Sequence, residues 1–211
     1  MDRPLDQAAT GPSTTSYAAP PSPRGVVLVL HGGTEHSRQV VDGRSASWRR
    51  AAALARSVAA EAEAFGAEVR LLRYGHRGWN GGAPVEDARW ALGEVRRELG
   101  DLPVVLLGHS MGARTAVHVA DDPVVRGVVA LAPWFPQGEP VRALAGRTLV
   151  AAHGRSDRIT SARATRAFVD RARLAGADAS FVDMGRVGHY LLRRVAAWNE
   201  LAAAESLKLL G

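Results

Sequence analysis

The chain has 211 residues, a formal net charge of +6 and no cysteine. This length suits one domain with a substantial core. The lack of cysteine excludes disulfides, thiolate metal sites and a cysteine nucleophile. Lys208 is the sole lysine, and the arginines are interleaved with Asp and Glu along the chain, so the positive charge predicts no nucleic-acid partner.

The N-terminal segment has a composition of its own. Residues 1–24 are rich in Pro, Ser and Thr, which predicts a flexible tail before a single domain at 25–211. The segment has no apolar stretch typical of a secretory signal. No apolar run in the chain reaches the roughly 20 residues of a membrane-spanning helix. We therefore expect a cytoplasmic protein without a membrane span.

From residue 26 onward, apolar runs typical of buried strands alternate with amphipathic helical patterns. Strands are predicted at 26–30, 68–74, 103–107, 124–132, 148–152 and 179–184. Helices are predicted at 48–65, 85–99, 111–120, 161–174 and 191–210, and a loop with one helical turn at 133–146. This alternation predicts an α/β fold, a three-layer α/β/α sandwich with a mostly parallel sheet of about six strands.

The third predicted strand runs into Gly108-His109-Ser110-Met111-Gly112, and a helical pattern follows directly. Strand, Gly-x-Ser-x-Gly and helix in this order are typical of a nucleophile elbow. Such a turn presents a serine hydroxyl to a base, and the flanking glycines allow close approach of the backbone. The motif alone also occurs in turns without chemistry. Its position between strand and helix predicts that Ser110 is a nucleophile.

A nucleophilic serine needs a histidine base and an acid that orients this base. Proteins with this elbow have the order Ser, Asp or Glu, His along the chain. Of the seven histidines, His189 fits the base because it follows the last strand, whereas His153 is set aside because it precedes the acid. Asp157, after the fifth strand, is the predicted acid, since active sites gather at the carboxyl ends of parallel strands. Asp183 is the alternative acid.

The oxyanion that develops during acyl transfer needs two preorganised N–H donors. One is predicted at Met111, directly after the nucleophile. The other is predicted at Gly33, in the Gly-Gly pair after the first strand, with Thr34 as the second choice.

Other features of the sequence concern ligands. Gly-x-Gly-x-x-Gly and P-loop motifs are absent, and no His/Asp cluster has metal-ligand spacing, so neither a cofactor nor a metal is predicted. Aromatic residues on loops at strand ends are candidates for an acyl pocket, with ordinary loop packing as the alternative. These residues are Trp79, Trp134, Phe135 and Tyr190.

Together these segments resemble the α/β-hydrolase family over roughly residues 25–195. The matching motifs are Leu30-His31-Gly32-Gly33, Gly75-His76-Arg77-Gly78, Gly108–Gly112, Ala130-Leu131-Ala132-Pro133, His153-Gly154-Arg155-Ser156-Asp157 and Gly188-His189. The resemblance implies Ser110 as nucleophile, Asp157 as acid and His189 as base. Many members carry a helical cap where this chain has only residues 134–146, so we expect a member without a cap and with an open site.

The sequence therefore predicts a serine hydrolase that cleaves small carboxylic esters through an acyl-enzyme intermediate. A thioesterase, an acyltransferase or a C–C bond hydrolase would use the same three residues. A non-catalytic binding module on the same fold is a further alternative.

Overall fold

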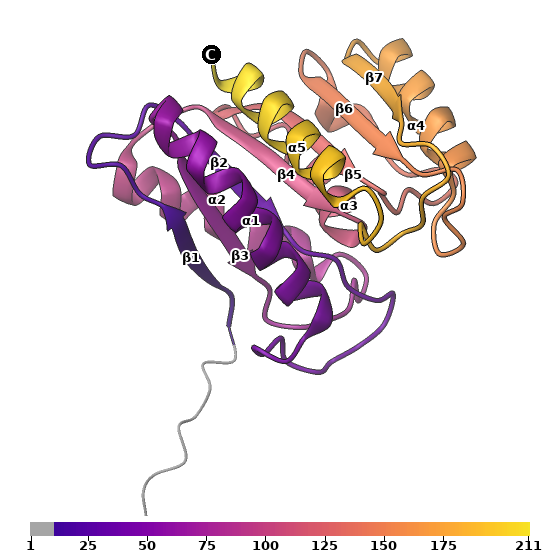
Figure 1. Ribbon diagram of the computed structural model, residues 1–211, viewed down its shortest axis with the longest axis horizontal. Coiled ribbons are helices and arrows are strands. Elements are labelled where there is room, and N and C mark those ends of the chain that lie inside the picture. The colour runs from indigo at the N-terminus through magenta and orange to yellow at the C-terminus, as the bar shows by residue number, and fades with distance from the viewer. Residues whose placement is uncertain (1–10) are drawn as a thin grey trace, which may run out of the picture.

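A computed structural model describes residues 11–211. Its centre is a sheet with the strand order β1-β3-β2-β4-β5-β6-β7 (Figure 1). The strands are β1 (Ser13–Ala18), β2 (Val26–Leu30), β3 (Glu68–Arg73), β4 (Val104–His109), β5 (Val125–Leu131), β6 (Thr148–His153) and β7 (Asp178–Asp183). The helices are α1 (Ala46–Phe65), α2 (Ala83–Leu99), α3 (Met111–His118), α4 (Ala162–Leu174), α5 (Val195–Leu210) and the short 3-10 helix η1 (Arg142–Leu144).

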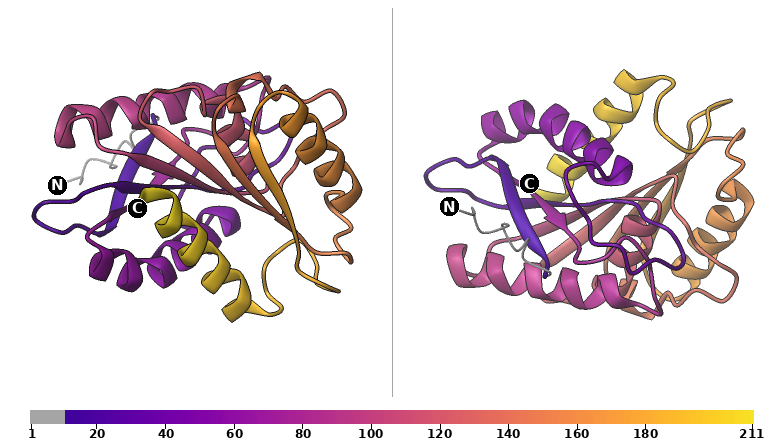
Figure 2. Two further views of the ribbon diagram at one scale, coloured as in Figure 1. Left: turned by 90° about the horizontal axis from the view of Figure 1, so that it is seen from above. Right: turned by 90° about the horizontal axis from the view of Figure 1, so that it is seen from below.

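The predicted three-layer fold is confirmed. Strands β2 to β7 are parallel, and helices cover both faces of the sheet. Helices α1 and α5 pack on one face, and α2, α3 and α4 pack on the other (Figure 2). Every residue of β2 and β4 is buried, because each of these central strands has a helical layer on both sides. This is why they appear in the sequence as continuous apolar runs.

The structure has a seventh strand, β1, in the segment that was expected to be a flexible tail, so that prediction is wrong for Ser13–Ala18. Ser13–Ala18 pair antiparallel with β3 at the edge of the sheet, and Ser16 Oγ donates a hydrogen bond of 2.7 Å to Glu68 Oε1. The strand is polar because one of its sides faces solvent, and it provides hydrogen-bond partners for the outer edge of β3. The rest of the predicted tail that precedes residue 11 lies outside the described residues.

The last helix begins later than predicted. Helix α5 starts at Val195 instead of residue 191. Leu191 and Arg194 have φ values of 58° and 57°, in the left-handed region, which cannot continue a right-handed helix. The segment between β7 and α5 is therefore an irregular loop.

The parallel arrangement places the carboxyl ends of six strands at one edge of the sheet. The loops that follow β2, β4, β6 and β7 meet there (Figure 1). Between β5 and β6, η1 is the only helical segment, so no cap covers this edge in the part of the chain that the structure describes. No helix within residues 11–211 is long and apolar enough to cross a membrane.

Candidate active site

The turn between β4 and α3 has the geometry of a nucleophile elbow. Ser110 has φ 56° and ψ −116°, a conformation that is strained for a residue other than glycine. A Cβ atom on Gly108 would lie 2.5 Å from Ala113 Cα, and one on Gly112 would overlap the carbonyl oxygen of Leu30. The glycines two before and two after the serine are thus required by contacts with backbone that cannot move aside.

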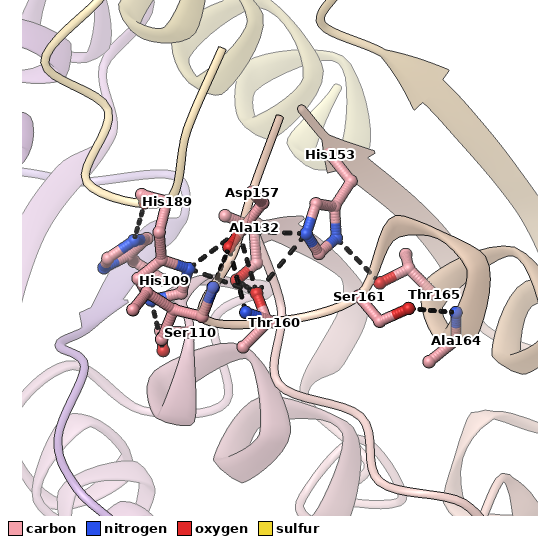
Figure 3. Close-up of polar contacts among 11 residues, drawn as sticks. His109, Ser110, Ala132, His153, Asp157, Thr160, Ser161, Ala164, Thr165 and His189 are labelled. Carbon is pink, nitrogen blue, oxygen red and sulfur yellow. Dashed lines mark hydrogen bonds and ion pairs between the residues drawn. The ribbon is translucent and has the colours of Figure 1, made fainter. Parts of the chain in front are cut away.

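The structure brings Ser110, His189 and Asp157 together at the carboxyl edge of the sheet (Figure 3). The Oγ of Ser110 lies 3.0 Å from His189 Nε2. The Nδ1 of His189 lies 2.8 Å from Asp157 Oδ2. With the proton of the neutral imidazole on Nδ1, Nε2 is free to accept the serine proton.

The carboxylate of Asp157 accepts hydrogen bonds at both oxygens. Its Oδ1 accepts from the backbone N–H groups of Ile159 at 2.8 Å and Thr160 at 2.9 Å. Its Oδ2 accepts from His189, from the Thr160 hydroxyl at 2.9 Å and from His153 Nε2 at 3.0 Å. Burial by itself would raise the pKa of Asp157, but the hydrogen bonds from His153, His189 and the two amides hold this pKa well below its usual range. The carboxylate is therefore ionised at neutral pH.

Sequence reasoning missed His153. Its side chain is fully buried, and its Nδ1 lies 2.8 Å from Thr165 Oγ1 on α4. The available signal was its position at the end of β6, four residues before Asp157. The alternative acid, Asp183, lies elsewhere: it accepts from the Gly185 N–H and pairs at the surface with arginines.

His109 holds the loop that carries His189. His109, the residue before the nucleophile, donates from Nε2 to the carbonyl oxygen of His189 at 2.9 Å. Burial, together with the neighbouring His189, lowers the pKa of His109 to about 3. His109 is therefore neutral at working pH, and it links the β4 elbow directly to the loop after β7.

The predicted oxyanion donors lie next to each other. A Cβ atom on Gly33 would come within 2.6 Å of Met111 Sδ, so the loop after β2 packs directly on the start of α3. Among the described residues, the backbone N–H groups of Gly33 and Met111 donate to no protein acceptor. The N–H of Thr34 instead donates to the carbonyl oxygen of Arg77 at 3.0 Å, so its proton is already engaged.

A cavity of about 370 Å³ opens beside Ser110 and His189. Trp134 and Tyr190, two of the predicted pocket residues, line it. Trp79 and Phe135 do not. Trp79 packs edge-on against Trp134 with the ring centroids 6.3 Å apart, and Phe135 stacks on Phe168 at 3.9 Å. Both of these side chains are buried in the core, so they serve ordinary loop packing, the alternative to a role in the pocket.

The chain matches a protein family in sequence and solved structures in fold. Residues 26–209 match the alpha/beta hydrolase family. No curated protein sequence matches the chain significantly. An alpha-beta serine hydrolase homologue from Coxiella burnetii superposes with a TM-score of 0.70 and 18% identity, covering 94% of each chain.

Two further solved structures share the fold. A serine hydrolase without a lid from Xanthomonas campestris has a TM-score of 0.65 and 16% identity, over 92% of this chain and 86% of that chain. A monoacylglycerol lipase from Paleococcus ferrophilus has a TM-score of 0.65 and 16% identity, over 94% of this chain and 99% of that chain. The family match spans most of the sequence, and these structures share the fold of this chain. The chain therefore belongs to the alpha/beta hydrolase family.

Proposed function

We propose that the protein is a serine hydrolase that cleaves carboxylic esters through an acyl-enzyme intermediate. Ser110 is the nucleophile, His189 the base and Asp157 the acid. The observation that carries this proposal is the continuous hydrogen-bonded series from Ser110 Oγ through His189 to Asp157, with separations of 3.0 Å and 2.8 Å. Each of these atoms is within direct proton-transfer or orienting distance of the next.

In the first half of the reaction, Ser110 Oγ attacks the acyl carbonyl while His189 Nε2 takes the hydroxyl proton. The ionised Asp157 stabilises the imidazolium that forms and keeps its ring oriented. The N–H groups of Gly33 and Met111 bind the oxyanion of the tetrahedral intermediate, and each is worth about 10² to 10³ in rate. His189 then gives its proton to the leaving alcohol.

In the second half, a water molecule replaces the alcohol and attacks the acyl carbonyl while His189 takes its proton. The bond between Ser110 Oγ and the acyl group then breaks, the carboxylic acid leaves and His189 returns the proton to Ser110 Oγ. The open edge of the sheet supports this step, because no cap separates the cavity from solvent in residues 11–211. At the mouth, Ile159 is 61% exposed and Tyr190 is 47% exposed. Small esters that enter from this side can be followed directly by water.

Covalent labelling tests the proposal. A fluorophosphonate probe should label the wild-type protein at Ser110, and Ser110→Ala should lose both labelling and hydrolysis of p-nitrophenyl acetate. Ser156→Ala is a matched control, because Ser156 is exposed in the turn after β6, and within the described residues its hydroxyl takes no part in the hydrogen bonds of Ser110, Asp157 and His189. A folded wild-type protein that neither labels nor hydrolyses esters would refute the proposal, as would activity that survives in Ser110→Ala.

A series of substrates then defines the acyl group. Esters and thioesters with acyl chains of increasing length should be compared by kcat/KM. We expect short acyl chains to be preferred, because the cavity beside Ser110 is about 370 Å³ and no cap within the described part of the chain extends it.

A further inference from the structure

Two histidines share one oxygen of Asp157. His189 Nδ1 lies 2.8 Å from Oδ2 and His153 Nε2 lies 3.0 Å from the same atom. Figure 3 shows the two rings on opposite sides of the carboxylate. The proposed reaction uses only His189 as its base, so it assigns no role to the buried His153.

The direction of the hydrogen bonds around His153 follows from the chemistry of its partners. The ionised carboxylate of Asp157 can only accept, so Nε2 of His153 must carry a proton. In a neutral imidazole Nδ1 then accepts, and the Thr165 hydroxyl, 2.8 Å away, donates to it. His153 and Thr165 are both fully buried, so water does not compete for either bond. Thr165 therefore donates a hydrogen bond to His153, and His153 donates one to Asp157.

The other charged or titratable groups near the pair come from neighbouring elements. His109 on β4 contacts the backbone of His189 and is neutral. Tyr190 follows His189, and its ring lies 4.8 Å from the guanidinium carbon of Arg50 on α1. None of these groups donates to Asp157 Oδ2. Besides the two histidines, the neutral hydroxyl of Thr160 is the only donor to that oxygen within the described residues.

The N–H of His153 affects how the carboxylate acts on the base. Without it, His189 and the Thr160 hydroxyl would be the remaining donors to Oδ2, and the less stabilised carboxylate charge would make His189 hold its own proton more tightly. A base that is protonated at neutral pH cannot accept the serine proton. The hydrogen bond from His153 also fixes Oδ2 on the side opposite His189, where the two backbone amides at Oδ1 exert no control.

We propose that His153 is a positioning residue, which fixes the carboxylate of Asp157 and limits how strongly it attracts the proton of His189. This inference rests on the proposed function, because it assigns His153 a part in the same site. His153 does not act as the base itself, since Asp157 lies between it and the reacting hydroxyl (Figure 3).

The test compares His153→Phe with His153→Gln. Phenylalanine keeps a buried ring but donates no hydrogen bond, whereas the glutamine amide can reach the position of Nε2. For His153→Phe we expect kcat to fall by about tenfold with KM unchanged, the scale of a lost hydrogen bond to a charged group. The acid limb of the pH profile should move to higher pH by about half a unit or more. His153→Gln should recover most of both changes.

A double-mutant cycle shows whether the effect passes through the carboxylate. In an Asp157→Asn background, His153→Phe should have little further effect on kcat. If His153→Phe does not fold, Thr165→Val removes the hydroxyl at Nδ1 with nearly constant volume, and should shift the acid limb in the same direction by a smaller amount. An unchanged rate, or a lower rate with an unchanged acid limb, would overturn the proposal.

A readout independent of turnover separates this inference from the proposed function. In Ser110→Ala, which needs no activity, the ring resonances of His189 can be followed by NMR as a function of pH. Their midpoint should lie at higher pH when His153→Phe is added. If the wild-type protein lacks esterase activity but this shift occurs, the proposed function fails and the coupling of the two histidines stands. If the activity is present and the midpoint does not move, only the role of His153 fails.

Discussion

Asp157→Asn removes the charge of the acid but keeps the shape of its side chain. Two backbone N–H groups lie 2.8 Å and 2.9 Å from Oδ1 and need an acceptor, so the amide oxygen of asparagine takes that place. The amide NH₂ then faces groups that now donate to Oδ2, including His189 Nδ1 and His153 Nε2. Donors would face donors at the centre of a buried site.

The physical consequence is a change of tautomer. His189 relieves the conflict when its proton moves from Nδ1 to Nε2, and Nε2 can then no longer accept the proton of Ser110. The substitution also removes the negative charge that stabilises the imidazolium. A triad in the wrong tautomer loses about 10⁴ in kcat, which corresponds to about 5.5 kcal/mol of transition-state stabilisation.

The assay is the steady-state hydrolysis of p-nitrophenyl acetate at pH 7.5. Asp183→Asn is the matched control, because Asp183 accepts a backbone N–H and pairs with Arg155 at the surface, away from His189. We expect the control to stay within about twofold of the wild-type kcat, since surface ion pairs contribute little. A loss of less than tenfold in Asp157→Asn, or a larger loss in Asp183→Asn, would refute this assignment of the acid.

Two further predictions concern stability. Gly112→Ala should cost about 3 kcal/mol or more of the free energy of unfolding, because its Cβ would overlap the carbonyl oxygen of Leu30. Gly93→Ala lies on α2 with no atom within 4 Å of the added Cβ, so it should raise the free energy of unfolding by about 0.5–1 kcal/mol. Equal changes in the free energy of unfolding for the two variants in urea denaturation would contradict the packing argument. Burial lowers the pKa of His31 from 6.5 to about 4. Burial and the neighbouring His189 lower the pKa of His109 to about 3. As the pH falls below 6.5, these histidines therefore bind protons in the unfolded chain before they do so in the folded protein. Stability should therefore decrease from pH 6.5 to about 4, by about 1.4 kcal/mol per pH unit for each histidine; a flat stability over this range in urea denaturation would contradict it.

The core elements could be predicted because their patterns reflect burial. Val26–Leu30 is predicted and observed with the same bounds, since a strand covered on both faces is apolar throughout. The edge strand Ser13–Ala18 could not be predicted in this way, because it is polar and its pairing partner, β3, lies 51 to 60 residues further along the chain. The late start of α5 depends on two left-handed residues, Leu191 and Arg194, and neither is a glycine that would mark the turn.

In the candidate site, too, some features could be predicted from the sequence and others could not. Chain order and strand ends predict that Ser110, Asp157 and His189 lie at one edge, and the structure brings their side chains within hydrogen-bonding distance. Sequence order alone set His153 aside, because order does not show which groups face a carboxylate from the other side. The loop aromatics could not be sorted either, since Trp134 and Phe135 are neighbours in the sequence but point to different surroundings.

The sequence by itself determined the α/β alternation, the elbow and the set of residues that can reach the carboxyl edge. These features depend on local patterns and on the parallel sheet, whose strands all end on one side. Only the tertiary structure decided which hydrogen bonds form at Asp157, which N–H groups are free near Ser110 and which aromatic rings line the cavity. Such details depend on how side chains from segments far apart in the chain are placed relative to one another, and no local pattern encodes that placement.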